Sequence, residues 1–302
     1  MFRALEMSKQ AFHQKLNRQL LFLQQMEQLL VLAKQIRLNH PRMSARQMYR
    51  LIRPQGIGRD RFEAFCFENG LKVSVKRAFH RTTNSLGVTR FSNLVSEFEL
   101  TAINQVWVSD ITYYRLGENF YYLTFILDLY SRAIVGHSIS SDLCTTSTTI
   151  PALQMAVKKR GKQTGIIIHS DGGGQYYCKE WLDLTAQYKF KNSMAETVYE
   201  NPNAERINGI IKNDYLQGYG PETYTELTEM TAEAVTNYNE EKPHGSLGNI
   251  SPNQFELLMN KEEPIHIQTK EKKKQKKKRR GNVDNSRRVT HIPANDYNNK
   301  YN

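Results

Sequence analysis

The chain of 302 residues has few cysteines and no long apolar run, and both shortages exclude classes of protein. Its three cysteines, Cys66, Cys144 and Cys178, lie far apart and form no C-x-x-C pair. Neither a disulfide framework nor a cysteine-rich zinc site is therefore expected. No apolar stretch approaches the roughly 18 residues that a membrane span needs, and the first ten residues lack the pattern of a signal peptide. We expect a cytoplasmic protein with no membrane partner.

The charges are distributed unevenly along the chain. Residues 1–90 carry 17 Lys and Arg against 5 Asp and Glu, and residues 270–280 carry 9 against 1. Residues 91–269 have the opposite balance, with 13 basic and 22 acidic side chains. Basic ends suit a polyanion, because each phosphate that Lys or Arg neutralises releases a counterion. An acidic centre repels phosphate unless a cation intervenes, so the pattern indicates a nucleic-acid enzyme that uses metal ions, with solubility alone as the alternative explanation.

The first 71 residues predict three helices. Apolar residues recur at helical spacing from about Gln19 to Arg37. Ser44 is placed to cap a second helix over residues 45–52, and a glycine-containing turn leads to a third helix that opens at Arg59 and stops at Asn69. Two helices joined by such a turn and carrying arginines resemble a helix-turn-helix unit. A small three-helix bundle without DNA contact is the alternative.

A linker over residues 72–100 precedes a change from helical to strand-like patterns. Three segments rich in β-branched and aromatic residues follow with short joins after the first two, which is typical of an antiparallel meander. These strands are predicted at 106–115, 119–130 and 133–139, with further strands at 165–169 and 190–194 and helices at 145–160, 181–188, 204–216 and 223–239. The order βββαβαβα predicts an α/β fold with a mixed five-stranded sheet flanked by helices.

Three acidic residues come from separate elements of this predicted sheet. Asp110 lies inside the apolar strand W-V-S-D-I-T-Y, where a charged side chain is seldom buried without a partner. Asp171 follows a short buried strand and precedes three glycines, at the strand end where ligands collect. Glu205 opens a helix. Each residue taken alone is more often structural, but their joint placement favours a Mg²⁺ site, because Mg²⁺ prefers carboxylate oxygens.

The motifs around these acids resemble those of insertion-sequence transposases of the OrfB type, whose core is related to retroviral integrases and ribonuclease H. The resemblance covers nearly everything up to about residue 260. It rests on the motifs W-V-S-D-I-T-Y, L-D-L-Y-S-R-A-I-V-G, H-S-D-G-G-G-Q-Y, N-A-E-R-I-N-G-I-I-K-N-D-Y-L and Y-N-E-E-K-P-H-G-S-L-G-N-I-S-P-N-Q-F.

This resemblance implies a ribonuclease H-like catalytic core preceded by an all-α helix-turn-helix domain. The expected organisation is a DNA-binding domain over residues 1–71, a linker over 72–100, the integrase-like core over 101–260 and a basic, disordered tail over 261–302.

The same resemblance implies the activity of a DDE-type transposase, with Asp110, Asp171 and Glu205 as its catalytic and metal-binding triad. Such an enzyme binds the terminal repeats of its element and catalyses strand cleavage and strand transfer with two Mg²⁺ ions, for which Mn²⁺ substitutes. The expected partners are the element ends, the target DNA, further copies of the chain and an upstream OrfA product. The alternatives are a catalytically silent DNA-binding accessory and a phage- or retrovirus-type integrase.

Five basic residues are expected at DNA. Arg59 and Arg61 open the third predicted helix, where recognition helices reach the major groove. Lys212, Lys242 and His244 match positions that the family places near DNA or the active site, although a lone histidine is more often structural.

The sequence departs from the family pattern between the second and third acids. Asp171 and Glu205 are separated by 33 residues, slightly fewer than in most relatives, and Glu200-Asn201 replaces the family's Asp-Asn pair. Glu196 and Glu200 compete with Glu205 for the third position, but only Glu205 has a helical continuation with a basic residue seven positions on. The basic run at 270–280 has no counterpart in the family, and we expect it to add non-specific attraction to DNA.

Overall fold

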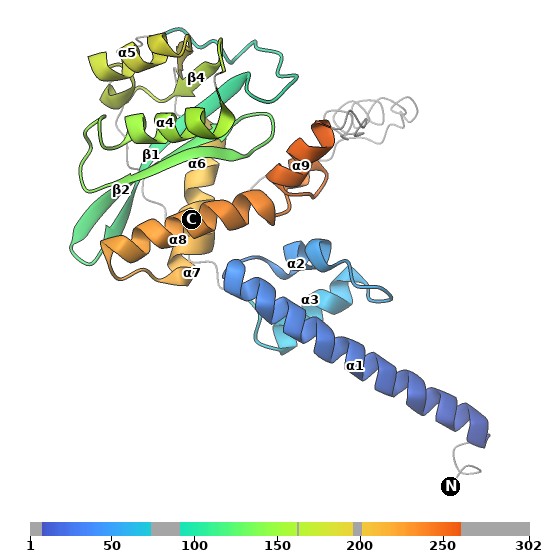
Figure 1. Cartoon of the computed structure of the whole chain (residues 1–302). Coiled ribbons are helices and arrows are strands. Elements are labelled where there is room, and N and C mark those ends of the chain that lie inside the picture. Colours follow the sequence, from blue (N-terminus) through green and yellow to red (C-terminus); the bar gives the residue numbers. More distant parts are fainter. Residues whose placement is uncertain (1–7, 74–90, 162, 196–200, 261–302) are drawn as a thin grey trace, which may run out of the picture. The chain divides into compact units, whose positions relative to one another are not determined.

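The computed structural model describes residues 8–73, 91–161, 163–195 and 201–260 (Figure 1). The predicted basic tail, most of the predicted linker, Glu196 and Glu200 lie outside the described residues. None of the described helices is long and apolar enough to cross a lipid bilayer.

The N-terminal region consists of three helices, as the sequence predicts. They are α1 (Lys9–Asn39), α2 (Ala45–Ile52) and α3 (Arg59–Glu68). Helix α1 begins ten residues before the expected start. Residues 9–18 are helical, but their side chains do not follow the helical spacing of apolar residues on which the prediction is based. Ser44 caps α2 in a reciprocal pair of hydrogen bonds with Gln47, which satisfies two backbone N–H groups at that helix end. Met48, Phe62 and Cys66 are fully buried in the small core that these helices share.

The catalytic-core region is built on the predicted mixed five-stranded sheet. Its strands are β1 (Val106–Leu116), β2 (Asn119–Asp128), β3 (Ile134–Ser140), β4 (Ile167–Ser170) and β5 (Lys191–Met194). The spatial order is β3-β2-β1-β4-β5. The meander β1–β2–β3 is antiparallel, whereas β4 runs parallel to β1 and β5 parallel to β4. This is the ribonuclease H-like arrangement that the sequence predicts.

Helices cover both faces of the sheet. The helices of the core region and their bounds are α4 (Thr149–Arg160), α5 (Lys179–Gln187), α6 (Pro202–Gly209) and α8 (Tyr224–Glu240). Val106 and Val108 of β1 pack in a core with α6 and α8, while Trp107 packs in a second core with α4 and α5 (Figure 1). Because side chains alternate along a strand, Asp110 has the orientation of Val106 and Val108 and faces α6.

Two parts of the core region differ from the sequence prediction. The single helix expected at 204–216 is divided into α6, a π-helical segment η4 (Ile210–Leu216) and the short α7 (Gln217–Tyr219). The chain also forms α9 (Pro252–Met259), which was not predicted as an element. Two short 3-10 turns, η2 (Gly174–Tyr176) and η5 (Gly245–Leu247), complete the described elements.

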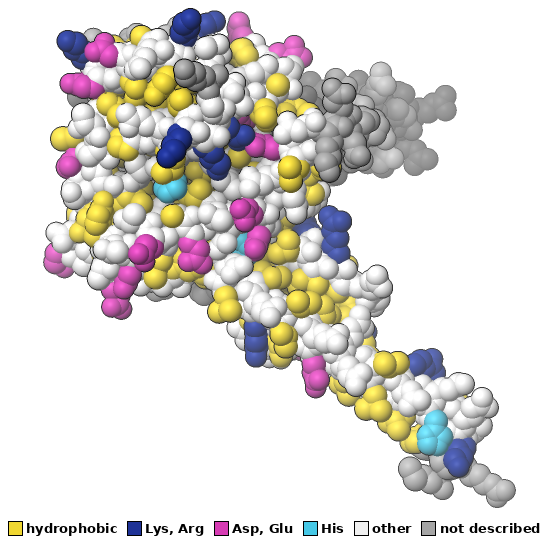
Figure 2. Space-filling view, in the orientation of Figure 1, with side chains coloured by type: hydrophobic (Ala, Val, Ile, Leu, Met, Phe, Trp, Pro, Cys, Tyr) yellow, Lys and Arg dark blue, Asp and Glu magenta, His cyan; other side chains and the backbone are white. Residues whose placement is uncertain are grey.

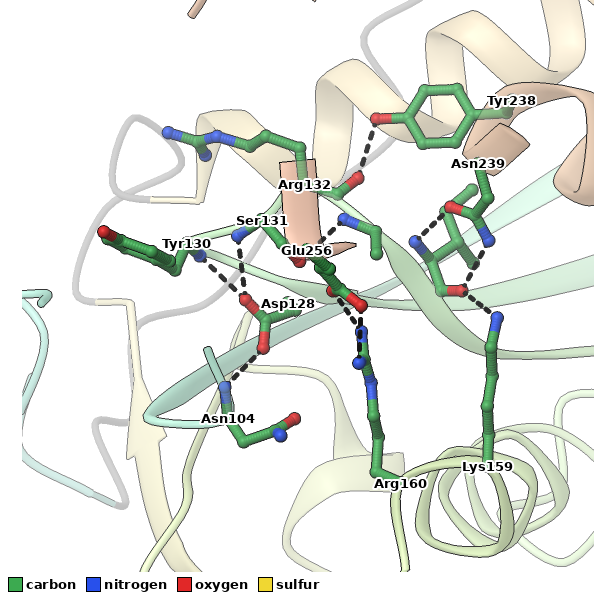
Figure 3. A network of polar contacts seen from close by, with 12 residues as sticks. Asn104, Asp128, Tyr130, Ser131, Arg132, Lys159, Arg160, Tyr238, Asn239 and Glu256 are labelled. Atoms are coloured by element: carbon green, nitrogen blue, oxygen red, sulfur yellow. Dashed lines mark hydrogen bonds and ion pairs between the residues drawn. The ribbon is translucent and has the colours of Figure 1, made fainter. Parts of the chain in front are cut away.

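A polar network holds α9 against the rest of the core (Figure 3). Arg160 at the end of α4 makes two hydrogen bonds to the Glu256 carboxylate, and the two side chains are only 12% and 14% exposed. Nearby, the buried Asp128 carboxylate accepts hydrogen bonds from the backbone N–H groups of Asn104, Tyr130 and Ser131, as Figure 3 shows. The network therefore fixes the end of β2 and the C-terminal helix through side chains from distant parts of the chain.

Helix α4 approaches the sheet closely at Gly136 of β3. A Cβ atom at this position would lie 2.1 Å from the backbone oxygen of Ala152 in α4. We expect Gly136→Ala to lower the free energy of unfolding by about 1–3 kcal/mol, because the backbone of α4 must move away. Gly245→Ala is the matched control, since a Cβ there meets no atom within 4 Å. Equal urea denaturation midpoints for the two variants would contradict this packing.

Candidate active site

Asp110 lies near the middle of β1, beside the point where β4 ends. Its Oδ1 accepts a hydrogen bond of 2.9 Å from the backbone N–H of Ile111, and its Oδ2 accepts one of 2.8 Å from Asn208 Nδ2. Strand β1 pairs with β4 only from Val106 to Val108. The carboxylate is therefore held at a break in the sheet, where the neighbouring strand has stopped and a ligand can approach.

Asp171 is the first residue after β4, and the strand register places it beside Asp110. Val108 pairs with His169 in the parallel ladder, so the same register continued by two residues sets Asp110 opposite Asp171. Neighbouring strands lie about 4.8 Å apart, and paired residues point to the same face. The Asp171 Oδ1 atom accepts a hydrogen bond of 3.2 Å from the backbone N–H of Gly173. The structure thus brings the two predicted aspartates together.

Glu205 lies in the first turn of α6, the helix that covers Asp110. It is exposed, whereas Asn208, three residues later, is buried and donates to Asp110. Residues three apart on a helix are neighbours on its surface, so Glu205 is on the side of α6 that faces the aspartates. Asn201, just before α6, donates to the backbone carbonyl of Ser109 over 3.0 Å. Both ends of α6 are therefore tied to the part of β1 that carries Asp110.

The proximity of the acids changes their titration. Burial, followed by the charge of Asp171 and then that of Glu205, raises the pKa of Asp110 to about 7, although the hydrogen bonds from Ile111 and Asn208 oppose the shift. Burial also raises the pKa of Asp171. Two neighbouring carboxyl groups with raised pKa values indicate a site that is short of positive charge.

The oxygen atoms around Asp110 are suitable ligands for a hard cation, but they do not yet surround a single point. In the part of the chain that the structure describes, no three acidic, His or Cys side chains already surround a common point at ligand distance. The buried Oδ1 atoms of Asn201 and Asn208 accept no hydrogen bond there, so they are available to waters carried by an ion. Oxygen donors with retained waters are the coordination that Mg²⁺ prefers. The residues present therefore fit Mg²⁺, and Glu205 adds an exposed carboxylate on the side of α6 that faces the aspartates.

The raised pKa of Asp110 predicts an unusual pH dependence of stability without divalent ions. The folded protein binds a proton at this carboxyl up to about pH 7, whereas the unfolded chain releases it near pH 4, so stability falls as the pH rises between these values. We expect Asp110→Asn to become progressively more stable than the wild type from pH 5 to pH 8, measured by urea unfolding in EDTA. Asp142→Asn is the control, because hydrogen bonds lower the pKa of Asp142, so its difference in stability from the wild type should stay constant over this pH range. A constant difference between Asp110→Asn and wild type would contradict the assignment.

Lys212 lies on η4 and reaches the same strand as Asp110. Its Nζ donates a hydrogen bond of 3.0 Å to Thr112 Oγ1, and Thr112 shares the strand face of Asp110. Burial lowers the pKa of Lys212, while the charge of Asp110 opposes the shift. The predicted cation is thus beside the acidic site, as its position seven residues after Glu205 implied, although a π-helical segment rather than a regular α-helix brings it there.

Lys242 and His244 lie inside the core region rather than on its surface. The Lys242 side chain is 4% exposed, and its Nζ lies 3.0 Å from Asp214 Oδ2. Burial, followed by the charges of Lys242 and two arginines, lowers the pKa of His244 to about 3, and its ring packs edge-on against Tyr238. The contact with DNA predicted for these two residues stays a prediction, and their described contacts are structural.

Arg59 and Arg61 lie at the start of α3, as predicted. The Arg59 guanidinium is half exposed and lies 2.8 Å from Asp60. The Arg61 guanidinium stacks over the ring of Phe22 of α1, 4.4 Å from its centroid. Both side chains are therefore oriented by neighbours on the helical region.

Comparison with known proteins identifies the family of this chain. The model of the integrase core domain matches residues 101–199, and a second integrase core domain model matches 186–252. The 31 kDa protein of insertion element IS600 from Shigella sonnei is 35% identical over 204 residues, which cover 66% of this chain and 75% of that protein. The chain belongs to the insertion-sequence transposases with an integrase core.

Further similar proteins are an insertion-sequence transposase, a viral integrase core and a viral intasome. Transposase InsF for insertion sequence IS3A of Escherichia coli (strain K12) is 31% identical over 195 residues, which are 62% of this chain and 66% of InsF. Among solved structures, the HTLV-2 integrase catalytic core domain in complex with magnesium aligns with 50% of this chain and 95% of its own length, at 25% identity and a TM-score of 0.43. The simian T-cell lymphotropic virus intasome aligns with 79% of this chain and 74% of its own, at 15% identity and a TM-score of 0.48.

Sequence reasoning missed Asn208, which makes the only side-chain hydrogen bond to Asp110 among the described residues. The signal was present, because Asn208 follows Glu205 by three positions and so shares its helix face. An asparagine in a helix carries no charge, however, and it drew no attention beside the acids.

Proposed function

We propose that this transposase binds the terminal repeats of its insertion element and catalyses metal-dependent cleavage and transfer of DNA strands. The family supports the coarse activity. The observation that carries the finer proposal is the strand register that puts Asp171 beside Asp110, under the helix that bears Glu205. Carboxylates gathered at a break in a sheet, with raised pKa values, need a cation to be ionised together.

The three acids are the proposed ligands of two divalent ions, Mg²⁺ or Mn²⁺. Asp110, oriented by hydrogen bonds from its own strand and from α6, would be the central ligand, and Asp171 and Glu205 would complete the set that holds the ions. When bound, such a pair supplies Lewis acidity to the attacking oxygen and stabilises the leaving 3′ oxygen. Asn208 and the Ile111 N–H orient the Asp110 carboxylate. Lys212 donates to Thr112, two residues after Asp110 on the same face of β1, and its ammonium is the proposed contact for a DNA phosphate.

The acidic side of the core region is an unsuitable surface for DNA. Figure 2 shows acidic side chains along α8, where Glu226, Glu229, Glu233 and Glu240 belong to a helix without a basic residue. Phosphate is repelled from such a face. DNA is therefore proposed to approach where Lys212 lies, and the basic helical region is proposed to bind the element end.

A metal-dependent nicking assay tests the proposal. A duplex carrying the terminal repeat from the DNA that flanks the gene is incubated with the purified chain in Mg²⁺, Mn²⁺ or EDTA. We expect a nick at the end of the repeat that requires the divalent ion, followed by joining to a second duplex. Binding without nicking in either ion would identify a silent DNA-binding accessory instead.

Assembly belongs to the same proposal. Strand transfer of a whole element requires both ends to be held together, so we propose at least two copies of the chain on DNA. An upstream OrfA product is a further proposed partner for recognition of the ends.

Replacing Arg59 and Arg61 together by Ala tests the helical region. We expect binding to the terminal repeat to weaken by about 1–3 kcal/mol for each lost base contact, with a smaller effect on random duplex. Arg50→Ala, which removes an exposed charge from α2, is the control for non-specific attraction. Affinity titrations on both duplexes distinguish base contacts from phosphate contacts. An equal loss of affinity for the terminal repeat and for random duplex would show that these arginines contact phosphates.

A further inference from the structure

An aromatic surface lies on the hairpin that carries Asp110, outside the triad. Strand register sets Tyr113 opposite Tyr122 and Arg115 opposite Phe120, and directly opposite residues point to the same face of a sheet. Tyr113 and Phe120 pack edge to face with centroids 5.6 Å apart. We call Tyr113, Arg115, Phe120 and Tyr122 the hairpin platform.

The hairpin platform is exposed although it is largely aromatic. Phe120 is 48% exposed, and the Arg115 side chain is 60% exposed. Neither Tyr113 nor Phe120 belongs to the two apolar clusters that α4, α5, α6 and α8 form with the sheet. Tyr113 and Tyr122 are half-buried, so Phe120 presents the exposed ring face of the platform to a flat ligand.

Positive charge adjoins the rings. Lys212 Nζ lies 4.8 Å from the centroid of Tyr113 while it donates to Thr112. Arg115 pairs with Glu118, but this pair is fully in solvent and therefore weak. The platform also lies on the face of the sheet opposite the acidic α8. Cations beside exposed aromatic rings are the arrangement that binds the backbone and stacked bases of single-stranded nucleic acid.

Asp110 and the platform side chains lie on opposite faces of β1, because side chains alternate along a strand. Lys212 connects them by contacting Thr112 on one face and Tyr113 on the other. Tyr113 follows Asp110 by three residues on one strand, which corresponds to roughly 10 Å. Bases stacked in one strand of DNA are spaced about 3.4 Å apart, so the platform is within about three nucleotides of a phosphate at Asp110. The Lys212 ammonium lies between the two positions, because it contacts both Thr112 and Tyr113.

We propose that the hairpin platform binds unpaired nucleotides of the DNA strand next to the reacting phosphate, with Tyr113 and Phe120 stacking on bases. This inference rests on the proposed function for the identity of the reacting strand. Opening of the DNA end would then be favoured by stacking on the protein, since every base has a face that an aromatic ring can contact. The surface requires no particular sequence.

The test compares forked and blunt oligonucleotides without catalysis. A duplex with a short unpaired thymidine arm and the same duplex without it are titrated against wild-type protein in EDTA. We expect Tyr113→Leu and Phe120→Leu each to weaken binding of the forked duplex by roughly tenfold, and to leave the blunt duplex nearly unchanged. Tyr113→Phe keeps the ring and should bind the fork as the wild type does.

Tyr224→Leu is the matched control, because Tyr224 is also 43% exposed but stacks on Tyr121, which points to the face of the hairpin opposite the platform. Thermal unfolding of every variant separates a folding defect from a binding defect, and Phe120→Leu, at the more exposed position, is the safer variant. Equal affinity of wild type, Tyr113→Leu and Phe120→Leu for the fork would overturn the proposal. A chain that never nicks its terminal repeat, yet shows the expected fork preference, would overturn the proposed function while leaving the platform intact.

Discussion

Asp110→Asn is expected to abolish strand cleavage and joining, with a rate loss of about a thousandfold or more. Removing the central metal ligand removes several kcal/mol of transition-state stabilisation, and each 1.4 kcal/mol is a factor of ten. The substitution keeps the size of the side chain, and the hydrogen bond from the Ile111 N–H can still be accepted by the amide oxygen. Binding of the terminal repeat should therefore be retained, which separates catalysis from recognition.

Asp183→Asn provides the control for this experiment. Asp183 is an exposed residue of α5, so its replacement removes the same charge far from the triad and should leave single-turnover rates within about twofold of the wild type, the effect of a neutral surface change. Joining by Asp110→Asn at a rate near that of Asp183→Asn would refute the assignment of the triad.

The largest expected loss of stability follows from breaking the pair between Arg160 and Glu256. Arg160→Met leaves the Glu256 carboxylate in a site where it is only 14% exposed. An uncompensated buried charge typically costs about 3–5 kcal/mol. We expect the free energy of unfolding to fall by that amount, measured by urea denaturation, and α9 to become the first segment to exchange its amide protons.

Two further variants test whether the buried, unpaired charge causes the loss of stability. Arg160→Met combined with Glu256→Met should regain most of the lost stability, because no charge is then left buried. Arg115→Met, which breaks the exposed pair with Glu118, should change stability by less than about 1 kcal/mol. If Arg160→Met costs no more than Arg115→Met, the pair does not anchor α9.

The fold could be predicted because its strongest signals are local. The strands predicted at 106–115 and 119–130 are long, rich in β-branched and aromatic residues and joined by three residues, so their type and pairing follow from the sequence. Asp110 and Asp171 were found for the same reason, since a charged residue in an apolar strand and an acid at a strand end are visible without coordinates. Their adjacency required the sheet order, which the family resemblance supplied.

The remaining features depend on contacts between distant residues. The apolar residues of the π-helical segment η4 are compatible with the spacing of a regular α-helix. The sequence therefore does not reveal the wider π-helical turn. The buried Lys242 pairs with Asp214, and the pKa of His244 is lowered by burial and then by three surrounding cations. These internal contacts join residues that are distant in the sequence, so they could not be predicted from it, and the DNA contacts expected for the two residues stay a prediction.

Iron-directed cleavage of the protein tests the central claim most directly. Fe²⁺ replaces Mg²⁺ at carboxylate sites, and the radicals it forms with ascorbate and peroxide cut the polypeptide next to the ion. We predict cuts near residues 110, 171 and 205 that excess Mg²⁺ suppresses and that Asp110→Asn abolishes. Cuts confined to other segments, or a pattern unchanged by Asp110→Asn, would contradict a metal site formed by these three acids.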